Sequence, residues 1–271
     1  MPGASNSAAR RVLVTGAGSG LGQALALRYA RAGDRVACVD LDVPRAESTR
    51  ASLPGSGHLA LAADVGDDAA MEGLHEGIQR EWGGLDVLVN NAGIASGGSM
   101  VETTMAEWRR ILEIDLLSVV RGCRLFLPGM LAQRRGQVIS TASFAGLAGA
   151  PGLMSYGTAK AAVVALSEQL RAEVEPHGVR VSVLCPSFFR TNLCDTGIGN
   201  PKTMQLALHL MDTAPDTCDS VADRVYAQAE AGRFLIIPTR HEPMRWRIKR
   251  WFPSLYYSML KKKFAALSAP R

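Results

Sequence analysis

The sequence predicts an α/β fold in which a doubly wound parallel sheet is covered by helices on both faces. Seven short runs rich in β-branched residues alternate with longer segments of helical periodicity, and most of these runs are apolar throughout. Strands buried on both faces have this continuous apolar pattern, and strand–helix alternation produces parallel sheets with right-handed crossovers. The 271 residues, 47% of them hydrophobic, suit one large domain, and no linker or repeat divides them.

The predicted elements follow one another in a regular order. The strands span residues 12–15, 35–40, 59–63, 85–90, 137–141, 179–184 and 234–237, and the helices span residues 21–32, 67–82, 104–134, 155–175 and 219–231. Residues 191–216 have a weak pattern broken by glycine and proline. We expect them to form a loop above the carboxyl edge of the sheet, with room for one short helix, where a substrate lid belongs.

A glycine-rich turn joins the first strand to the first helix. Its TGxxxGxG pattern places Gly16, Gly20 and Gly22 where they let the backbone approach a pyrophosphate, with Ser19 and Leu21 between them. The amides and dipole of the helix N-terminus favour negative charge there. Glycines alone could form only a tight connection, but the flanking strand, helix and later acid together predict a dinucleotide site.

Asp40, at the end of the second strand, is that later acid. A carboxylate at this position accepts hydrogen bonds from ribose hydroxyls and repels a 2′-phosphate. Neither Ser19 nor Leu41 offers a compensating cation, so we expect NAD as the cofactor rather than NADP. The alternative interpretation is that Asp40 only opens a turn with Asp42.

The remaining motifs complete a set that resembles the short-chain dehydrogenase/reductase family, in the branch with TGxxxGxG and YxxxK motifs. Asn90-Asn91-Ala92-Gly93 follows the fourth strand, and Ser143, Tyr156 and Lys160 follow the fifth. The resemblance covers residues 12–191. It implies a Rossmann-type sheet of seven strands, a nicotinamide cofactor, catalytic roles for Ser143, Tyr156 and Lys160, and a homodimer or homotetramer joined through the long helices.

The resemblance also implies which positions contact the cofactor. Asp64 and Val65 match adenine contacts, Pro186 and Thr191 match the nicotinamide side, and Asn90 matches a residue that steadies the central strand. The full implied set is Gly16, Ser19, Gly20, Leu21, Gly22, Asp40, Leu41, Asp64, Val65, Asn91, Ala92, Gly93, Tyr156, Lys160, Pro186, Phe189 and Thr191.

Elementary chemistry supports the catalytic roles. Tyr156 and Lys160 are four residues apart and therefore share one helix face. A neighbouring ammonium and an oxidised nicotinamide stabilise a tyrosinate, so we expect the pKa of Tyr156 to fall from its usual value of about 10. Tyr156 would then take the proton of an alcohol, Lys160 would hold the nicotinamide ribose, and Ser143 would orient the substrate oxygen.

Asp115 stands where the family usually has asparagine, which is thought to hold a water of a proton relay. We expect Asp115 to belong to the site and to hold the same water. Its charge would raise the pKa of Lys160 and oppose a lowered pKa of Tyr156. The alternative is that it only bonds backbone groups at a helix bend.

Apolar residues surround the expected substrate position and favour an apolar secondary alcohol or its ketone. The alternative is that several of them only pack between the loop and the sheet. We therefore expect an NAD-dependent dehydrogenase. A non-catalytic dinucleotide sensor and an NADP-dependent ketoacyl-type reductase stay open as alternatives, the latter disfavoured by Asp40. The expected pocket residues are Phe144, Leu147, Leu153, Met154, Phe188, Phe189, Leu193, Met204 and Leu206.

Charge and cysteine usage exclude several classes of protein. Residues 233–271 hold ten basic residues and one acid, a net charge of +9, while the rest of the chain has a net charge of −4. This distribution argues against a protein-wide nucleic-acid-binding surface. The five cysteines never form a CxxC pair, so we expect neither a disulfide framework nor a metal site. No apolar run is long enough for a membrane span and the start, MPGASNSAARR, has no signal-peptide core, so we expect a cytoplasmic protein.

A basic, aromatic-rich extension, residues 240–271, follows the expected catalytic domain of residues 1–239. Aromatic residues beside arginine and lysine can lie on an anionic membrane, or pack on the body or a partner subunit. For Trp246, Trp251 and Phe252 we favour protein packing, with peripheral membrane contact as the alternative. Pro253 interrupts the segment, which predicts two short helices.

Overall fold

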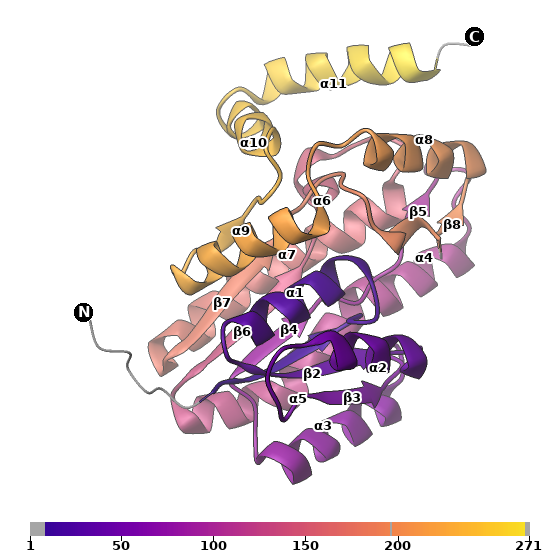
Figure 1. Cartoon of the computed structure of the whole chain (residues 1–271). Coiled ribbons are helices and arrows are strands. Elements are labelled where there is room, and N and C mark those ends of the chain that lie inside the picture. Colours follow the sequence, from indigo (N-terminus) through magenta and orange to yellow (C-terminus); the bar gives the residue numbers. More distant parts are fainter. Residues whose placement is uncertain (1–8, 196, 269–271) are drawn as a thin grey trace.

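Seven parallel strands form the central sheet of the computed structural model, which describes residues 9–195 and 197–268 (Figure 1). The order across the sheet is β3-β2-β1-β4-β6-β7-β9. The direction of winding reverses between β1 and β4, so the predicted doubly wound, Rossmann-type fold is confirmed. The strands are β1 (Arg11–Thr15), β2 (Arg35–Asp40), β3 (Leu59–Ala62), β4 (Val87–Asn90), β6 (Gly136–Thr141), β7 (Val179–Leu184) and β9 (Leu235–Ile236).

The strands are apolar because both faces of the sheet are covered. In β1, Leu13 belongs to one hydrophobic cluster, whereas Val12 and Val14 belong to the other, and all three are fully buried. Alternate side chains of a strand point to opposite faces, so a continuous apolar run fills two cores at once. The parallel register places apolar residues of neighbouring strands side by side, with Val14 opposite both Cys38 of β2 and Val89 of β4.

Helices cover the sheet in two layers. The helices α1 (Gly20–Arg31), α2 (Val43–Ser52) and α9 (Cys218–Glu230) contribute to the cluster on one face. The helices α3 (Asp68–Trp82), α5 (Ser118–Gln133) and α7 (Met154–Val174) contribute to the cluster on the other. Each layer therefore buries its apolar stripe against strands whose carboxyl ends point to the same edge of the sheet.

Shorter elements gather above that edge. They are α6 (Phe144–Ala148), α8 (Pro201–Asp212), the 3-10 turn Asn192–Cys194, and a small parallel pair of β5 (Ser96–Gly97) with β8 (Ile198–Gly199). Another 3-10 turn, Glu175–His177, follows α7. The expected loop of residues 191–216 thus contains the one α-helix for which it had room, and it is tied to β5 through β8.

The main differences between the predicted and the observed elements are of three kinds. The single helix of residues 104–134 is divided into α4 (Met105–Leu112), a π-helical turn (Glu113–Leu117) and α5. Helix α2 was not predicted because its composition is mostly polar, although Asp42 caps its N-terminus and a proline lies in its first turn. Strands β3, β4 and β9 are one or two residues shorter than predicted, since pairing rather than composition ends them.

The C-terminal extension forms two helices that meet at Pro253, as predicted: α10 (Glu242–Trp251) and α11 (Pro253–Ser268). Trp246 packs against the core. Trp251 and Phe252 remain 74% and 63% exposed, so they do not pack on the body of this chain, and their packing on a partner subunit stays a prediction. None of the helices in the described part of the chain is long and apolar enough to cross a membrane.

Some residues that support sequence-based expectations lie outside the described part. They are residues 1–8 of the N-terminal segment, residue 196 of the expected loop, and residues 269–271, which include one basic residue of the extension.

Candidate active site

The carboxyl ends of the central strands open into a cavity of 1230 Å³. It lies where the strand order reverses between β1 and β4, because loops that leave in opposite directions leave a crevice between them. A pocket for one drug-sized ligand has a volume of about 300–1000 Å³. This cavity therefore has room for a dinucleotide together with a substrate.

The glycine turn forms one wall of the cavity. Gly16 and Gly20 have left-handed backbone conformations, with φ of 65° and 54°. A Cβ on Gly22 would lie 2.0 Å from the carbonyl oxygen of Gly16, so no larger residue fits there. Within the described residues, the first turn of α1 contains no acid, and its N-cap Ser19 makes no side-chain capping bond. The amides of this turn are thus available to an anionic group.

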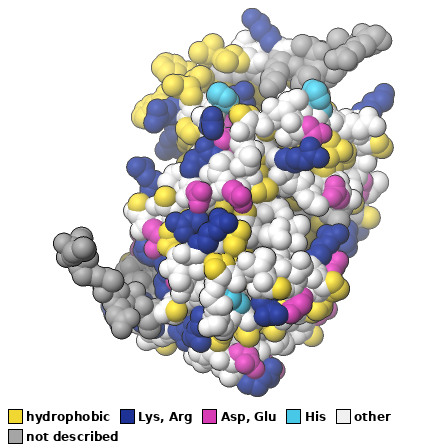
Figure 2. All heavy atoms as spheres, viewed as in Figure 1, with side chains coloured by type: hydrophobic (Ala, Val, Ile, Leu, Met, Phe, Trp, Pro, Cys, Tyr) yellow, Lys and Arg dark blue, Asp and Glu magenta, His cyan; other side chains and the backbone are white. Residues whose placement is uncertain are grey.

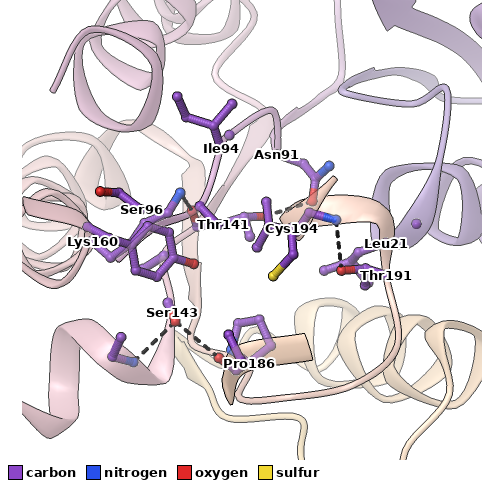
Figure 3. Close-up of a pocket in the computed structure, with 18 of the residues that line it drawn as sticks. Leu21, Asn91, Ile94, Ser96, Thr141, Ser143, Lys160, Pro186, Thr191 and Cys194 are labelled. Atoms are coloured by element: carbon purple, nitrogen blue, oxygen red, sulfur yellow. Dashed lines mark hydrogen bonds between the residues drawn. The ribbon is translucent and has the colours of Figure 1, made fainter. Parts of the chain in front are cut away.

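Hydrogen bonds between neighbouring strands hold the next wall. The Thr15 hydroxyl accepts from the backbone amides of Asn91 and Ala92 at 2.9 and 3.0 Å. The Asn91 side chain donates to the Thr15 carbonyl oxygen and accepts from the Thr141 hydroxyl at 3.2 Å (Figure 3). Asn90, behind it, is buried and donates to Cys123. The loop after β4 is therefore fixed to β1 and β6.

Asp40 lies at the opposite end of the cavity. Its Oδ2 accepts from the Gly18 amide at 2.8 Å and its Oδ1 accepts from the Asp42 amide at 3.0 Å. The carboxylate thus opens the turn before α2 and also lines the cavity, and its contact with a ribose stays a prediction.

Arg45 also lines this end, with its Nε 3.3 Å from Asp42 Oδ2. Arg45 was not predicted as a cavity residue because the helix that carries it, α2, was not predicted. The signals that could have revealed it are the N-capping Asp42 and the proline that follows, which together mark a helix start.

Ser143, Tyr156 and Lys160 all line the cavity. Ser143 caps α6, where its Oγ accepts from the Ala145 amide at 3.1 Å and lies 3.5 Å from the Pro186 carbonyl oxygen (Figure 3). Tyr156 and Lys160 lie one turn apart on α7, with Lys160 Nζ 5.8 Å from the tyrosine ring centroid. The buried ammonium donates to the Thr141 carbonyl oxygen at 3.1 Å.

Asp115 lies behind Lys160 and does not line the cavity. The π-helical turn places its fully buried carboxylate so that Oδ1 accepts from the Ile94 amide at 2.8 Å. Oδ2 lies 3.5 Å from Lys160 Nζ and has no hydrogen-bond partner among the described residues. Asp115 therefore both bonds the backbone at a helix bend and contacts the lysine of the site.

Burial dominates the proton equilibria of this group. It raises the pKa of Tyr156, the charge of Asp115 raises it further, and the Ser143 hydroxyl opposes the change. In the protein by itself the pKa of Tyr156 is therefore raised, and the fall expected with an oxidised nicotinamide bound stays a prediction. Burial also raises the pKa of Asp115, against the attraction of Lys160. Desolvation outweighs the attraction of Lys160 for Asp115, and it outweighs the hydrogen bond of Ser143 for Tyr156.

The structure brings all the expected cofactor contacts and Ser143 to this one cavity. Of the expected pocket residues, Leu147, Met154 and Leu206 do not line it, and Leu147 is buried in the core instead. The six that do are Phe144, Leu153, Phe188, Phe189, Leu193 and Met204. No group of three or more potential metal ligands occurs in the described residues.

Sequence patterns missed the contribution of the C-terminal helices to the cavity. The interruption at Pro253 predicted two short helices in the extension, but nothing local indicated which surface they cover. The cavity residues that were not predicted from the C-terminal helices are Arg245, Ile248, Tyr256, Met259 and Leu260, and those from elsewhere include Arg110, Ile94, Ala95 and Ser96.

Comparison with known proteins identifies the family of the chain. The family model described as short chain dehydrogenase matches residues 10–197. The chain is 37% identical to meso-2,3-butanediol dehydrogenase of Serratia marcescens over 182 residues, which are 67% of this chain and 72% of that protein. It is 35% identical to 2-(S)-hydroxypropyl-CoM dehydrogenase 3 of Xanthobacter autotrophicus over 225 residues, 82% of this chain and 83% of that protein.

Two further matches extend the comparison. The probable oxidoreductase EphD of Mycobacterium tuberculosis is 36% identical over 196 residues, which cover 71% of this chain but only 33% of that longer protein. Among solved structures, a short chain dehydrogenase/reductase from Burkholderia phymatum in complex with NAD superposes with a TM-score of 0.84 and 26% identity, covering 91% of this chain and 95% of the other.

Proposed function

The chain belongs to the short-chain dehydrogenase/reductase family, and from that premise we propose that it is an NAD-dependent oxidoreductase that interconverts an apolar secondary alcohol and its ketone. One observation carries the proposal. Ser143, Tyr156 and Lys160 open into the same cavity as the glycine turn and Asp40.

The residues of the cavity fit a nicotinamide dinucleotide. The amides at the start of α1 would hold its pyrophosphate, Asp64 and Val65 its adenine, and Lys160 its nicotinamide ribose. The crowding around Gly22 supports this fit, because a side chain at this position would collide with the Gly16 carbonyl oxygen and distort the turn. When bound, the cofactor supplies hydride exchange with the carbinol carbon of the substrate.

Asp40 supports NAD as the preferred cofactor. Its carboxylate would bond the ribose hydroxyls and repel a 2′-phosphate. Arg45 is the cation at this end that could attract such a phosphate, but its guanidinium is engaged with Asp42 at 3.3 Å. The carboxylate of Asp40 carries no comparable ion pair among the described residues, so its repulsion should prevail.

Tyr156 would act as the general acid and base. Because burial raises the pKa of its phenol, Tyr156 is protonated near neutral pH, which suits donation to a ketone oxygen. In the oxidative direction a phenolate is needed, and the ammonium of Lys160 supplies positive charge 5.8 Å from the ring. Ser143 would orient the substrate oxygen, and Asp115 would act through Lys160 as a positioning residue.

The walls around this centre support an apolar substrate. Phe144, Leu153, Phe188 and Met204 line the cavity, and they would exclude water from the reacting atoms. Arg245 also reaches the cavity, but it is paired with Glu242 at 3.0 Å. The name of the butanediol relative supports the alcohol class.

Turnover measurements test the proposal. Purified protein is supplied with NAD or NADP and with aliphatic, steroid and sugar alcohols, while the absorbance of the reduced cofactor is followed. We expect turnover of apolar secondary alcohols with NAD, and its loss in Tyr156→Phe but not in the matched control Tyr226→Phe, which alters a tyrosine packed against Tyr29. Binding of NAD without turnover of any alcohol or ketone would identify a dinucleotide sensor instead.

A further inference from the structure

The C-terminal helices expose an unusual amount of apolar surface. Half of the exposed large apolar side chains in the described chain lie between residues 244 and 264, and Figure 2 shows apolar side chains gathered at this end of the molecule. Contiguous exposed apolar patches mark interaction surfaces. We call this set the tail surface: Met244, Trp251, Phe252, Leu255, Tyr257, Met259 and Phe264.

The helices that carry the tail surface also carry exposed basic residues without acidic partners among the described residues. Arg247, Arg250, Lys261 and Lys262 are exposed, and none of them forms an ion pair with another described residue. The one acid of the extension, Glu242, is already paired with Arg245. Charge complementarity therefore calls for an anionic partner.

We propose that α10 and α11 lie on an anionic lipid surface, with the apolar side chains of the tail surface in the interface and the basic residues on lipid phosphates. Aromatic rings beside lysine and arginine suit this position, because the ring enters the interface while the cation stays with the headgroups. A twofold contact between two copies is less suitable. It would bring the same uncompensated cations of both copies together.

The body of the protein holds these helices in a defined orientation. Trp246 packs against the core, and the Lys249 ammonium donates to the Leu147 carbonyl oxygen of α6. Burial lowers the pKa of Lys249, in keeping with a role as an anchor rather than as a headgroup contact. Helix α11 then extends from this anchor across the end of the molecule (Figure 1).

The same helices line the cavity, so the lipid surface would lie beside the entrance. Ile248 of α10 and Tyr256, Met259 and Leu260 of α11 contribute to its walls. An apolar alcohol or ketone dissolved in a bilayer could then enter without crossing water. This part of the inference rests on the proposed function, whereas the docking itself does not.

Vesicle flotation of the full chain tests the docking. We expect the protein to float with phosphatidylserine–phosphatidylcholine vesicles at low salt, and not with phosphatidylcholine alone. Binding should weaken as salt is raised, because the Debye length falls from about 30 Å at 0.01 M to about 3 Å at 1 M. Absence of flotation with the anionic vesicles at low salt would overturn the proposal.

Two double variants distinguish the effect of the basic residues on α11 from the effect of the net charge of the protein. The double variant Lys261→Glu, Lys262→Glu should lower the partitioning of the protein onto anionic vesicles at least about tenfold. Each cation near an anionic membrane contributes about 1 kcal/mol to binding. Arg31→Glu with Arg80→Glu makes the same change in net charge on exposed residues of α1 and α3, and should leave partitioning unchanged. An equal loss in both pairs would contradict docking through the tail surface.

The aromatic residues have a matched control of their own. The double variant Trp251→Ser, Phe252→Ser should reduce flotation with anionic vesicles without lowering the melting temperature. The control variant Met100→Ser, Val101→Ser, on another exposed turn, should leave flotation unchanged. If the aromatic variant instead dissociates a dimer and floats as well as the wild type, the surface is covered by a second copy and the proposal is wrong.

Kinetics test the link to the cavity. A lipid-soluble alcohol presented in anionic vesicles should be turned over faster by the wild type than by the Lys261→Glu, Lys262→Glu variant, while a water-soluble alcohol is turned over equally by both. Equal rates with the lipid-soluble alcohol would refute the entry route. Flotation requires no activity, so failure of the proposed function would leave the docking result intact.

Discussion

Replacing Asp115 by asparagine should remove a buried charge while keeping its main hydrogen bond. The Oδ1 atom of either side chain can accept from the Ile94 amide, which is 2.8 Å away in the structure. The change therefore isolates the effect of the carboxylate charge on its neighbours Lys160 and Tyr156.

The size of that effect follows from two distances. Asp115 Oδ2 lies 3.5 Å from Lys160 Nζ, which lies 5.8 Å from the Tyr156 ring centroid, so the carboxylate and the ring centre are less than about 10 Å apart. At an effective dielectric constant of about 20, a unit charge at about 10 Å contributes about 1.7 kcal/mol. Slightly more than one pKa unit corresponds to this energy.

The direction of the change is fixed by the sign of the charge. Asp115 raises the pKa of Tyr156, so its neutralisation should lower that pKa. The phenolate that accepts a proton from an alcohol then forms at lower pH. In Asp115→Asn, the alkaline rise of the oxidation rate should move down by about one pH unit, and the fall of the reduction rate should move with it.

Initial rates of both directions across a pH series measure this shift. Asp68→Asn is the matched control, because its carboxylate is 79% exposed and pairs with Arg121 outside the cavity. It should leave both profiles in place. An Asp115→Asn variant that stays folded with an unchanged profile would show that Asp115 has no electrostatic effect on the proton step.

Other parts of the site have their own tests. Tyr156→Phe should lower turnover at least about a hundredfold with NAD affinity near that of the wild type, since general acid–base groups contribute about 10²–10⁴-fold; retained turnover would exclude Tyr156 as that group. The wild type should bind NAD at least about tenfold more tightly than NADP, and Asp40→Ala should narrow the gap in a titration of both cofactors; tighter binding of NADP by the wild type would contradict this. Gly22→Ala should abolish NAD binding and lower the free energy of unfolding by about 1–3 kcal/mol, because the added Cβ would lie 2.0 Å from the Gly16 carbonyl oxygen. Unchanged melting and titration curves in Gly22→Ala would refute the close approach in the turn.

Apolar periodicity and motif spacing were enough to predict the sheet and the order of the site motifs. Val12, Leu13 and Val14 are apolar in succession because each must fill one of two cores, and this pattern is visible without a structure. The glycine turn was equally readable, because the backbone conformations at Gly16 and Gly20 are properties of the local chain. Since parallel strands end at one edge, motifs that follow successive strands converge on one cavity.

The side chains that approach that cavity from distant parts of the chain could not be predicted from local patterns. Arg45 reaches the Asp40 end through a helix with little apolar periodicity. The sequence predicted Asp115 in the site, but not the π-helical turn that brings its Oδ2 to 3.5 Å from Lys160 Nζ. Lys249 and Leu147, 102 residues apart, join the extension to α6. Local periodicity shows which face of a helix is apolar. The surface that this face covers depends on packing between segments far apart in the sequence, which no local pattern records.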